Sequence, residues 1–387
     1  MIEEYRIARV WRVFIYLFAP LMAALFIYVA LLPLLESTYH SQGWILSLAG
    51  LLMIALCIGG IVDAYKSRLI FGEDAITQVS IWKEKVLPYS QVKGFTHNDK
   101  FLYIIPINDS HPKIKVSSYT ENFEDLKTEL AGRFTDLDHE RYIREEMELL
   151  QNEALGTTAE EREIMVQKAR KTARLFNILG IADAIWLLVF PAPYELCIDC
   201  SILLTAAGFY ILYKYRGIIR INEIPKSAYP NITYVLFLSS LGLMVRALSD
   251  YNLFRYGLLI ALTVPGGILL TVLLWYCSGN LKDRSLMIKS AYYIVILSAF
   301  FYGACVQINA LQDKSPGRIY FSRILDKRIS RGKITTYYLS LTPWGPQKKR
   351  DDVEVSKNLY RETSTGETVR VHFRKGYLGF RWFYVTE

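Results

Sequence analysis

The sequence contains little of the chemistry on which most enzymes and metalloproteins depend. It has 5 histidines and 5 cysteines in 387 residues. It carries no HExxH, GxSxG, P-loop or Rossmann glycine pattern. Cys197 and Cys200 form the only CxxC, so a four-cysteine zinc site is excluded. No histidine lies inside an apolar segment, which excludes a bis-histidine haem in a membrane. We therefore predict no catalytic residues, no cofactor and no metal ligands.

Long apolar segments, in contrast, are abundant. Hydrophobic residues make up 52% of the chain, and the mean hydropathy is +0.19. A helix needs about 20 mostly apolar residues to cross a bilayer. Seven segments approach or meet that length: Val13–Leu35, Trp44–Val62, Leu175–Phe190, Leu196–Tyr213, Ile232–Val245, Tyr256–Cys277 and Ala291–Gln307. We expect a multi-pass α-helical membrane protein with about seven spans. The third to fifth are short, so they either borrow flanking residues or, for the third and fourth, form a re-entrant pair.

Basic residues flank the predicted spans unevenly, and this predicts their orientation. They precede the first and third spans and follow the second and fourth (Arg6, Arg9, Arg12, Lys66, Arg68, Lys168, Arg170, Lys171, Arg174, Lys214, Arg216). The loop Glu36–Gly43 has no Lys or Arg. Because basic residues are retained on the cytoplasmic side, the N-terminus and residues 67–173 should be cytoplasmic. Seven spans then place the C-terminal domain outside, whereas failure of one of the last three segments to span would place it inside. Arg246 and Arg255 are the discordant basic residues.

Composition divides the chain into five parts. We expect a two-span hairpin over 1–66, a strand-rich domain over 67–135, a helical stalk over 136–173, a five-span bundle over 174–310 and a β-domain over 311–387. Short runs of alternating apolar residues predict the strands of the second part. The spacing of Phe123, Leu126, Leu130 and Phe134 then predicts an amphipathic helix over Glu121–Phe134.

Four segments carry a resemblance to a known family. They are Ile70–Ile76, Leu87–Phe95, Lys113–Val116 and Asn122–Leu126. With two apolar spans before them, they resemble the bacterial pleckstrin-homology-like (PH-like) membrane proteins over roughly residues 44–134. The resemblance implies a cytoplasmic PH-like α+β barrel closed by one helix. It implies no catalytic residues.

The C-terminal part is basic and should form a small all-β domain. Residues 312–387 hold 16 Lys/Arg and 8 Asp/Glu, an excess equal to the net charge of the whole chain. This surface either contacts anionic lipid or is an ordinary basic surface, and no motif favours nucleic acid. Alternating runs near Tyr337–Leu341 and Thr368–Phe373 predict strands. Segments within 359–382 resemble a β-rich domain of uncharacterised bacterial membrane proteins.

Asp183 lies near the middle of the third predicted span, and carboxylates inside spans often mark ion or proton paths. Cys197 and Cys200, at the predicted outer end of the fourth span, either form a local disulfide or remain unpaired thiols. The leading hypothesis is a non-enzymatic scaffold or envelope-sensing protein of the bacterial inner membrane, with a protein partner or a second copy. The alternatives are a small-solute or proton-coupled transporter using Asp183, and a membrane enzyme whose residues converge only in the fold.

Overall fold

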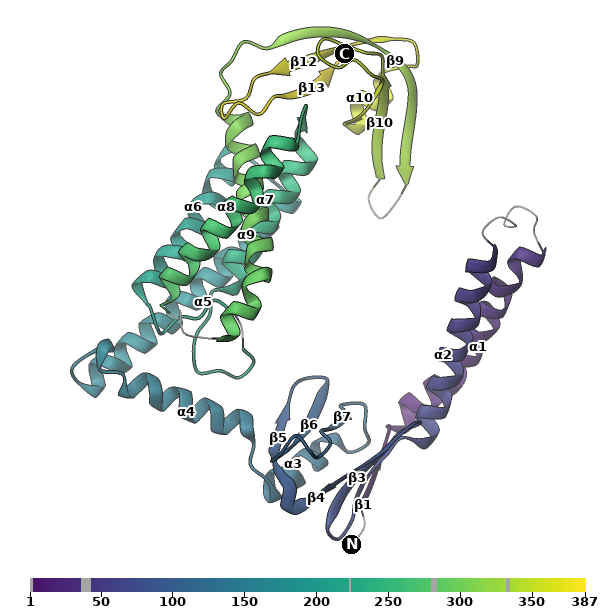
Figure 1. Cartoon of the computed structure of the whole chain (residues 1–387), viewed down its shortest axis with the longest axis vertical. Coiled ribbons are helices and arrows are strands. Elements are labelled where there is room, and N and C mark those ends of the chain that lie inside the picture. Colours follow the sequence, from purple (N-terminus) through teal and green to yellow (C-terminus); the bar gives the residue numbers. More distant parts are fainter. Residues whose placement is uncertain (1–2, 36–42, 223, 280–283, 332–334) are drawn as a thin grey trace. The chain divides into compact units, whose positions relative to one another are not determined.

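The computed structural model describes residues 3–35, 43–222, 224–279, 284–331 and 335–387. Residues 36–42, which make up most of the predicted loop without Lys or Arg, therefore lie outside the described part. The chain forms two compact units (Figure 1). One comprises Met1–Met147 with Pro225–Ala228, and the other comprises Glu148–Ile224 with Tyr229–Glu387.

The first unit contains a four-stranded antiparallel sheet in the order β1-β2-β3-β4. Its strands are β1 (Glu3–Arg6), β2 (Arg68–Phe71), β3 (Ala75–Val79) and β4 (Glu84–Pro88). The last three lie where alternating residues predict them. The sequence analysis missed β1, because a four-residue strand beside a long apolar helix has no readable period.

A second antiparallel sheet follows, in the order β5-β6-β7. It comprises β5 (Val92–His97), β6 (Phe101–Pro106) and β7 (Ile114–Ser117), and helix α3 (Phe123–Arg133) comes next in the chain. Side chains from both sheets and from α3 share one core (Leu69, Phe71, Ile76, Leu87, Val92, Phe95, Leu102, Ile104, Ile114, Val116, Leu126, Leu130). The predicted strands and amphipathic helix are confirmed.

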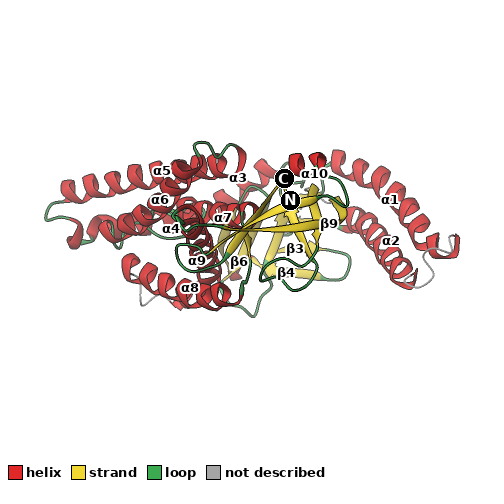
Figure 2. Ribbon diagram, turned by 90° about the horizontal axis from the view of Figure 1, so that it is seen from above, coloured by secondary structure: helices red, strands yellow, loops and turns green. Residues whose placement is uncertain are grey.

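Two long helices, α1 (Arg9–Leu35) and α2 (Gly43–Lys66), pack against each other (Figure 2). Their apolar side chains point outward, as Leu17 and Leu48 do with 72% and 61% of their surfaces exposed. Such surfaces suit a lipid environment, in which outward-facing side chains are apolar.

Helix α4 (Leu137–Gln151) begins in the first unit and leads towards α5 (Ala159–Val189). A capping box begins α5: Thr158 Oγ1 accepts from Glu161 N at 3.1 Å, and the Thr158 N–H donates to Glu161 Oε2 at 3.2 Å. Because α5 is continuous over 31 residues, the expected boundary between stalk and bundle at 173/174 falls inside one helix. The third span has borrowed its flanking residues.

Helices α6 (Tyr194–Lys214), α7 (Thr233–Asp250), α8 (Gly257–Ser278) and α9 (Arg284–Leu311) complete a bundle with α5 (Figure 1). One end carries the C-terminal sheet and is called the sheet end. It holds Val189, Tyr194, Asp250, Gly257 and Leu311. The opposite end, called the loop end, holds Lys214, Thr233 and Ser278.

Within the described residues, six helices are long and apolar enough to cross a membrane: α1, α2, α5, α6, α8 and α9. Helix α7 is not among them, because it has 18 residues and its last turns contain Arg246 and Asp250. It nevertheless packs against α5, α6 and α9 and returns the chain from the loop end to the sheet end. At about 1.5 Å per residue, its 18 residues extend about 27 Å, close to the thickness of a bilayer core.

The sheet of the second unit has six strands in the order β11-β10-β9-β12-β13-β8. They are β8 (Asn252–Leu253), β9 (Arg318–Arg331), β10 (Thr335–Leu341), β11 (Asp351–Val355), β12 (Thr368–Arg374) and β13 (Trp382–Thr386), and α10 (Lys357–Glu362) follows β11. The two halves of β9 pair with different strands: residues 318–323 with β12, and residues 324–331 with β10. The sheet is thereby a nearly closed barrel.

Candidate functional site

Asp183 lies in a buried polar layer inside the bundle. It projects from α5 with 6% of its surface exposed, and the hydroxyl of Ser201 on α6 donates to its Oδ1 at 2.6 Å. The Ser239 hydroxyl of α7 lies in the same environment and is fully buried. Among the described residues, neither Oδ2 of Asp183 nor Oγ of Ser239 has a hydrogen-bond partner that meets normal geometry. A buried polar atom without a partner is costly, so this layer has capacity for a proton or a water molecule.

The number of protons available at the Ser201 hydroxyl also indicates that Asp183 carries a proton. Its Oγ lies 2.6 Å from Asp183 Oδ1 and 2.8 Å from the Cys197 carbonyl oxygen. A hydroxyl has only one proton to donate, so it cannot satisfy both acceptors. A protonated Asp183 removes the conflict, because its O–H donates to Ser201 while Ser201 donates to Cys197. The geometry therefore suits a neutral, proton-carrying Asp183.

A second polar layer lies at the sheet end. The Tyr194 hydroxyl of α6 is 2.6 Å from Asp250 Oδ2 and 3.0 Å from Gln307 Oε1. Arg246 Nη2 lies 3.0 Å from Asp250 Oδ2, and its guanidinium stands 5.6 Å from the centre of the Tyr194 ring. The i, i+4 spacing of Arg246 and Asp250 predicts this pair. Gln307 of α9 is fully buried, and its Nε2 has no partner among the described residues.

An apolar layer separates the two polar layers. It consists of Leu187 on α5, Cys197 and Ile198 on α6, and Leu243 on α7, each at most 1% exposed. The helical period produces the order, because Tyr194, Cys197 and Ser201 share one face of α6, while Ser239, Leu243 and Arg246 share one face of α7. This apolar layer interrupts the polar line between Asp183 and the sheet end.

Two side chains at the end of α9 hold the loop between β12 and β13. Asn309 donates through Nδ2 to Phe380 O at 2.8 Å and accepts at Oδ1 from the N–H groups of Leu378 (3.0 Å) and Phe380 (3.2 Å). Asp313 Oδ2 accepts from the Gly376 N–H at 2.8 Å and from Trp382 Nε1 at 2.9 Å. The bundle and its sheet are therefore joined by buried hydrogen bonds. The sequence analysis missed both side chains, because their partners lie more than 60 residues away.

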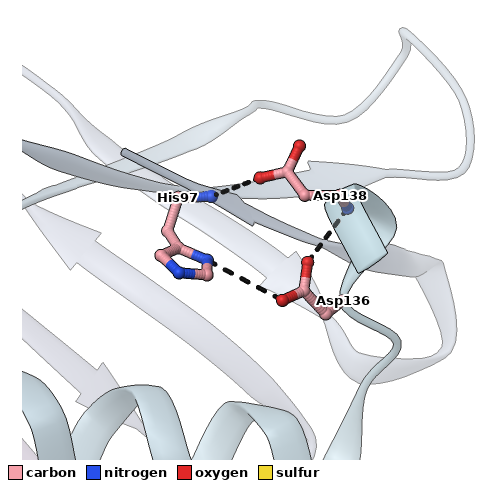
Figure 3. Close-up of side chains that lie close together, drawn as sticks. All are labelled: His97, Asp136 and Asp138. Carbon is pink, nitrogen blue, oxygen red and sulfur yellow. Dashed lines mark hydrogen bonds and ion pairs between the residues drawn. The ribbon is translucent and has the colours of Figure 1, made fainter. Parts of the chain in front are cut away.

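A separate cluster in the first unit brings together His97, Asp136 and Asp138 (Figure 3). Asp136 Oδ1 accepts from the N–H groups of Asp138 (2.9 Å) and His139 (3.3 Å), as an N-cap residue does. Asp138 Oδ2 accepts from the His97 N–H at 3.1 Å, and His97 Nδ1 lies 3.8 Å from Asp136 Oδ2. One potential ligand atom from each residue lies within 4.8 Å of the others.

Positive side chains already face these carboxylates. Arg141 Nη2 lies 2.8 Å from Asp138 Oδ1, and Lys226 Nζ lies 3.4 Å from Asp138 Oδ2. Burial, with the charge of Lys226 beside it, holds the pKa of His97 below its usual value. The side chains therefore fit a structural anchor for residues 225–228 better than a metal centre, because Asp138 already pairs with two cations and Asp136 Oδ1 already accepts from two N–H groups.

No protein-family model, no curated protein and no solved structure matches this chain. The resemblances noted from the sequence thus remain untested, and the site must be interpreted from its own geometry.

The predicted site residues have different outcomes. Asp183 is buried in the bundle and is hydrogen-bonded to Ser201. Cys197 and Cys200 are free thiols in this structure, and Cys197 packs in the apolar layer. His372 stacks on Tyr384 with ring centres 4.6 Å apart, and its Nε2 lies 2.9 Å from Thr386 Oγ1.

Proposed function

We propose that this protein is a bacterial inner-membrane sensor or scaffold in which α7 couples a cytoplasmic PH-like module to an extracytoplasmic β-domain. The observation that carries the proposal is that each end of α7 leads into a segment built into a folded β-structure. A helix anchored in this way transmits a shift at one end to the other, provided that it moves as a rigid element.

The segment before α7 is anchored in the first unit. Residues Pro225–Ala228 belong to that unit, although they lie in the connection between α6 and α7. Glu145 of α4, 7% exposed, accepts from Ser227 Oγ at 2.6 Å and from the Ala228 N–H at 2.9 Å. Lys226 donates to the His97 carbonyl oxygen at 2.8 Å.

The segment after α7 is anchored in the sheet of the second unit. β8 pairs with β13, and the Phe254 N–H donates to Arg381 O at 2.9 Å. Leu253 and Trp382 share a core with residues of α7, α8 and α9. The Tyr251 and Trp382 rings meet edge to face at 5.5 Å. Movement of the end of α7 therefore changes the edge of this sheet.

Close backbone packing makes α7 rigid between its two anchors. A Cβ at Gly180 of α5 would lie 2.5 Å from Val235 Cα, and a Cβ at Gly303 of α9 would lie 2.7 Å from Leu243 C. Both distances are shorter than real contacts, so only glycine permits these approaches. Helix α7 is held between α5 and α9 without room for bending.

The proposed sidedness rests on the basic residues. Those of the loop end favour a cytoplasmic position for it and for the first unit, and the sheet end would then face outside if α7 crosses the membrane. Arg246, discordant in the sequence, is compatible with this because Asp250 pairs with it. The two sheets and terminal helix of the first unit support the PH-like proposal. A protein partner or a second copy would receive the signal, and the basic C-terminal surface would lie near anionic lipid.

Hydrogen exchange on the full chain in lipid nanodiscs tests the coupling. Glu145→Gln removes the charge that Ser227 and Ala228 contact, and the matched control Glu140→Gln alters an exposed carboxyl on the same helix. We expect Glu145→Gln, but not the control, to speed exchange at the Ala228 amide and also at Phe254. Faster exchange at Ala228 with Phe254 unchanged would overturn the proposal.

A second candidate function is proton-coupled transport through Asp183. The buried, unpartnered Oδ2 of Asp183 and Oγ of Ser239 favour it. The apolar layer of Leu187, Cys197 and Leu243 opposes it, because a proton would need water to cross this layer. Transport therefore requires an opening motion between α5, α6 and α7, and the sensor proposal does not.

A further inference from the structure

The nearly closed sheet of the second unit leaves a seam between its two edges. The edges are β11 on one side and β13 with β8 on the other. β8 is two residues long and pairs only with Trp382 and Phe383. β13 continues through Thr386, and among the described residues no strand pairs with this side of it beyond Phe383. The end of β13 is thus a free strand edge.

The main-chain groups of Val385 point to this free edge. The Phe254 N–H donates to Arg381 O on the β8 side of β13. In an antiparallel sheet, alternate residues direct their N–H and C=O groups to the same side. Phe383 and Val385 therefore direct theirs to the side of Arg381 O, and β8 reaches only as far as Phe383. The N–H and C=O groups of Val385 remain available.

The opposite edge contributes a matching strand. Glu354 O of β11 accepts from Asn252 Nδ2 at 3.4 Å, which shows that Glu354 directs its main-chain groups away from β10. Glu354 and Val385 line one cleft of about 1050 Å³. Ligand sites commonly have volumes of about 300–1,000 Å³. The cleft is large enough for a short extended peptide.

Charged side chains of both signs surround the cleft. Glu354, Glu362 and Glu387 face Lys357 and Arg370. Within the described residues none of these five forms an ion pair. The carboxylates outnumber the cations, which favours a ligand with basic side chains.

The aromatic residues argue against a sugar. Carbohydrates would stack on open aromatic faces, but the Tyr384 ring already stacks on His372 at 4.6 Å and lies 5.7 Å from Trp382. Tyr337 lies 5.1 Å from Tyr360. The accessible features of the cleft are main-chain groups at strand spacing and charged side chains, and both match a polypeptide.

We propose that this cleft binds an extended peptide with polar and basic side chains, which adds as a strand to the free edge of β13. The inference rests on the proposed sensor function and names the class of ligand that its outer domain recognises. A strand bound there would continue the line of β8, the segment that follows α7. Its binding would therefore act on the end of the coupling helix.

The test uses the full chain in lipid nanodiscs and a short synthetic peptide of alternating threonine and lysine. We expect binding, together with slower hydrogen exchange at the Val385 amide. The same peptide, N-methylated at every second residue to remove the edge-facing donors, should bind at least about tenfold more weakly, since several hydrogen bonds are lost. Equal binding of the methylated peptide, or no binding by either, would overturn the proposal.

Charge variants provide a second measurement. Glu354→Lys with Glu362→Lys should weaken the lysine peptide and strengthen a threonine–glutamate peptide, whereas the control Lys348→Glu, outside the cleft, should change neither. A chitin oligosaccharide that binds and displaces the peptide would also contradict the peptide proposal. If the peptide does not bind, but Glu145→Gln still speeds exchange at both Ala228 and Phe254, the peptide proposal is rejected and the sensor function is retained.

Discussion

The hydroxyl of Ser201 lies 2.6 Å from Oδ1 of Asp183, and this contact joins α5 to α6 in the middle of the bundle. Both residues are buried, and no basic side chain is paired with Asp183 among the described residues. A carboxylate with one hydrogen bond in an apolar bundle is costly unless it carries a proton. A structural role and a transport role of Asp183 therefore predict different behaviour for variants that replace this carboxyl group.

Asp183→Asn mimics the protonated carboxyl and should leave folding nearly unchanged. Asn keeps a donor for Ser201 and an acceptor, so the thermal unfolding temperature in detergent should match that of the unaltered protein. Asp183→Leu removes both and leaves the Ser201 hydroxyl with the Cys197 carbonyl oxygen as its remaining partner, at a cost of about 1–3 kcal/mol. In the sensor account, proteoliposomes containing either variant show the same proton flux as the unaltered protein. If the unaltered protein conducts protons and Asp183→Asn does not, the result would instead support transport.

Asp313 should make the second unit sensitive to acid. Burial alone would raise the pKa of its carboxyl, but hydrogen bonds from Ser315, Trp382 and Gly376 together outweigh burial and hold the pKa below its ordinary value. A lowered pKa means that the stabilisation is present above the ordinary carboxyl value and is lost as the pH falls through the folded value. Unfolding followed by tryptophan fluorescence should show this loss between about pH 5 and pH 2.

The variant Asp313→Asn provides the comparison for that acid transition. It cannot ionise, so it should lose about 1–3 kcal/mol of stability at neutral pH and show a shallower dependence on acid. An Asp313→Asn protein with the same acid profile as the unaltered protein would mean that other carboxyls dominate the transition.

His97 should give the first unit a pH dependence of the same sign as that of Asp313, but nearer neutrality. Burial and the charge of Lys226 lower its pKa, so the fold favours neutral imidazole. The unfolded chain therefore binds the proton more readily, and stability should fall as the pH drops below about 6.5. Denaturant unfolding between about pH 8 and pH 5.5 measures the slope. His97→Gln should reduce it, whereas the exposed His139→Gln should retain it.

Gly303 should be among the least replaceable residues of the bundle. In Gly303→Ala the new Cβ would lie 2.7 Å from Leu243 C, a main-chain atom that cannot rotate away. Helices α7 and α9 would have to separate, at about 1–3 kcal/mol. Gly257→Ala adds the same methyl group at the start of α8, where nothing lies within 4 Å. Thermal unfolding should therefore distinguish the two, and an equal effect would contradict the close packing of α7.

The sequence predicted the elements that have a readable period and missed those that depend on distant partners. Alternation located β3 and β4, helical spacing located α3, and i, i+4 spacing predicted the Arg246–Asp250 pair. β1 and β8 were missed, because two to four residues carry no period. The Asp183–Ser201 contact was missed as well, since it depends on how α5 and α6 turn towards each other.

The predicted number of spans shows a similar limit. The mean hydropathy of α7 is lower than that of the six spanning helices, because α7 contains Arg246 and Asp250. These two side chains nevertheless pair with each other in the bundle. The sequence predicts seven spans, whereas six helices among the described residues are long and apolar enough to cross a membrane, and α7 is the predicted span that falls short.

The most direct test of the account is side-specific labelling of the two β-structures in intact bacterial cells. Lys83→Cys places a thiol on the exposed turn between β3 and β4, and Lys348→Cys places one on the exposed segment between β10 and β11. A membrane-impermeant maleimide should label Lys348→Cys in intact cells and Lys83→Cys only after lysis, with the unaltered protein as the background. Labelling of both variants, or of neither, before lysis would place the two β-structures on one side of the membrane and contradict coupling across it by α7.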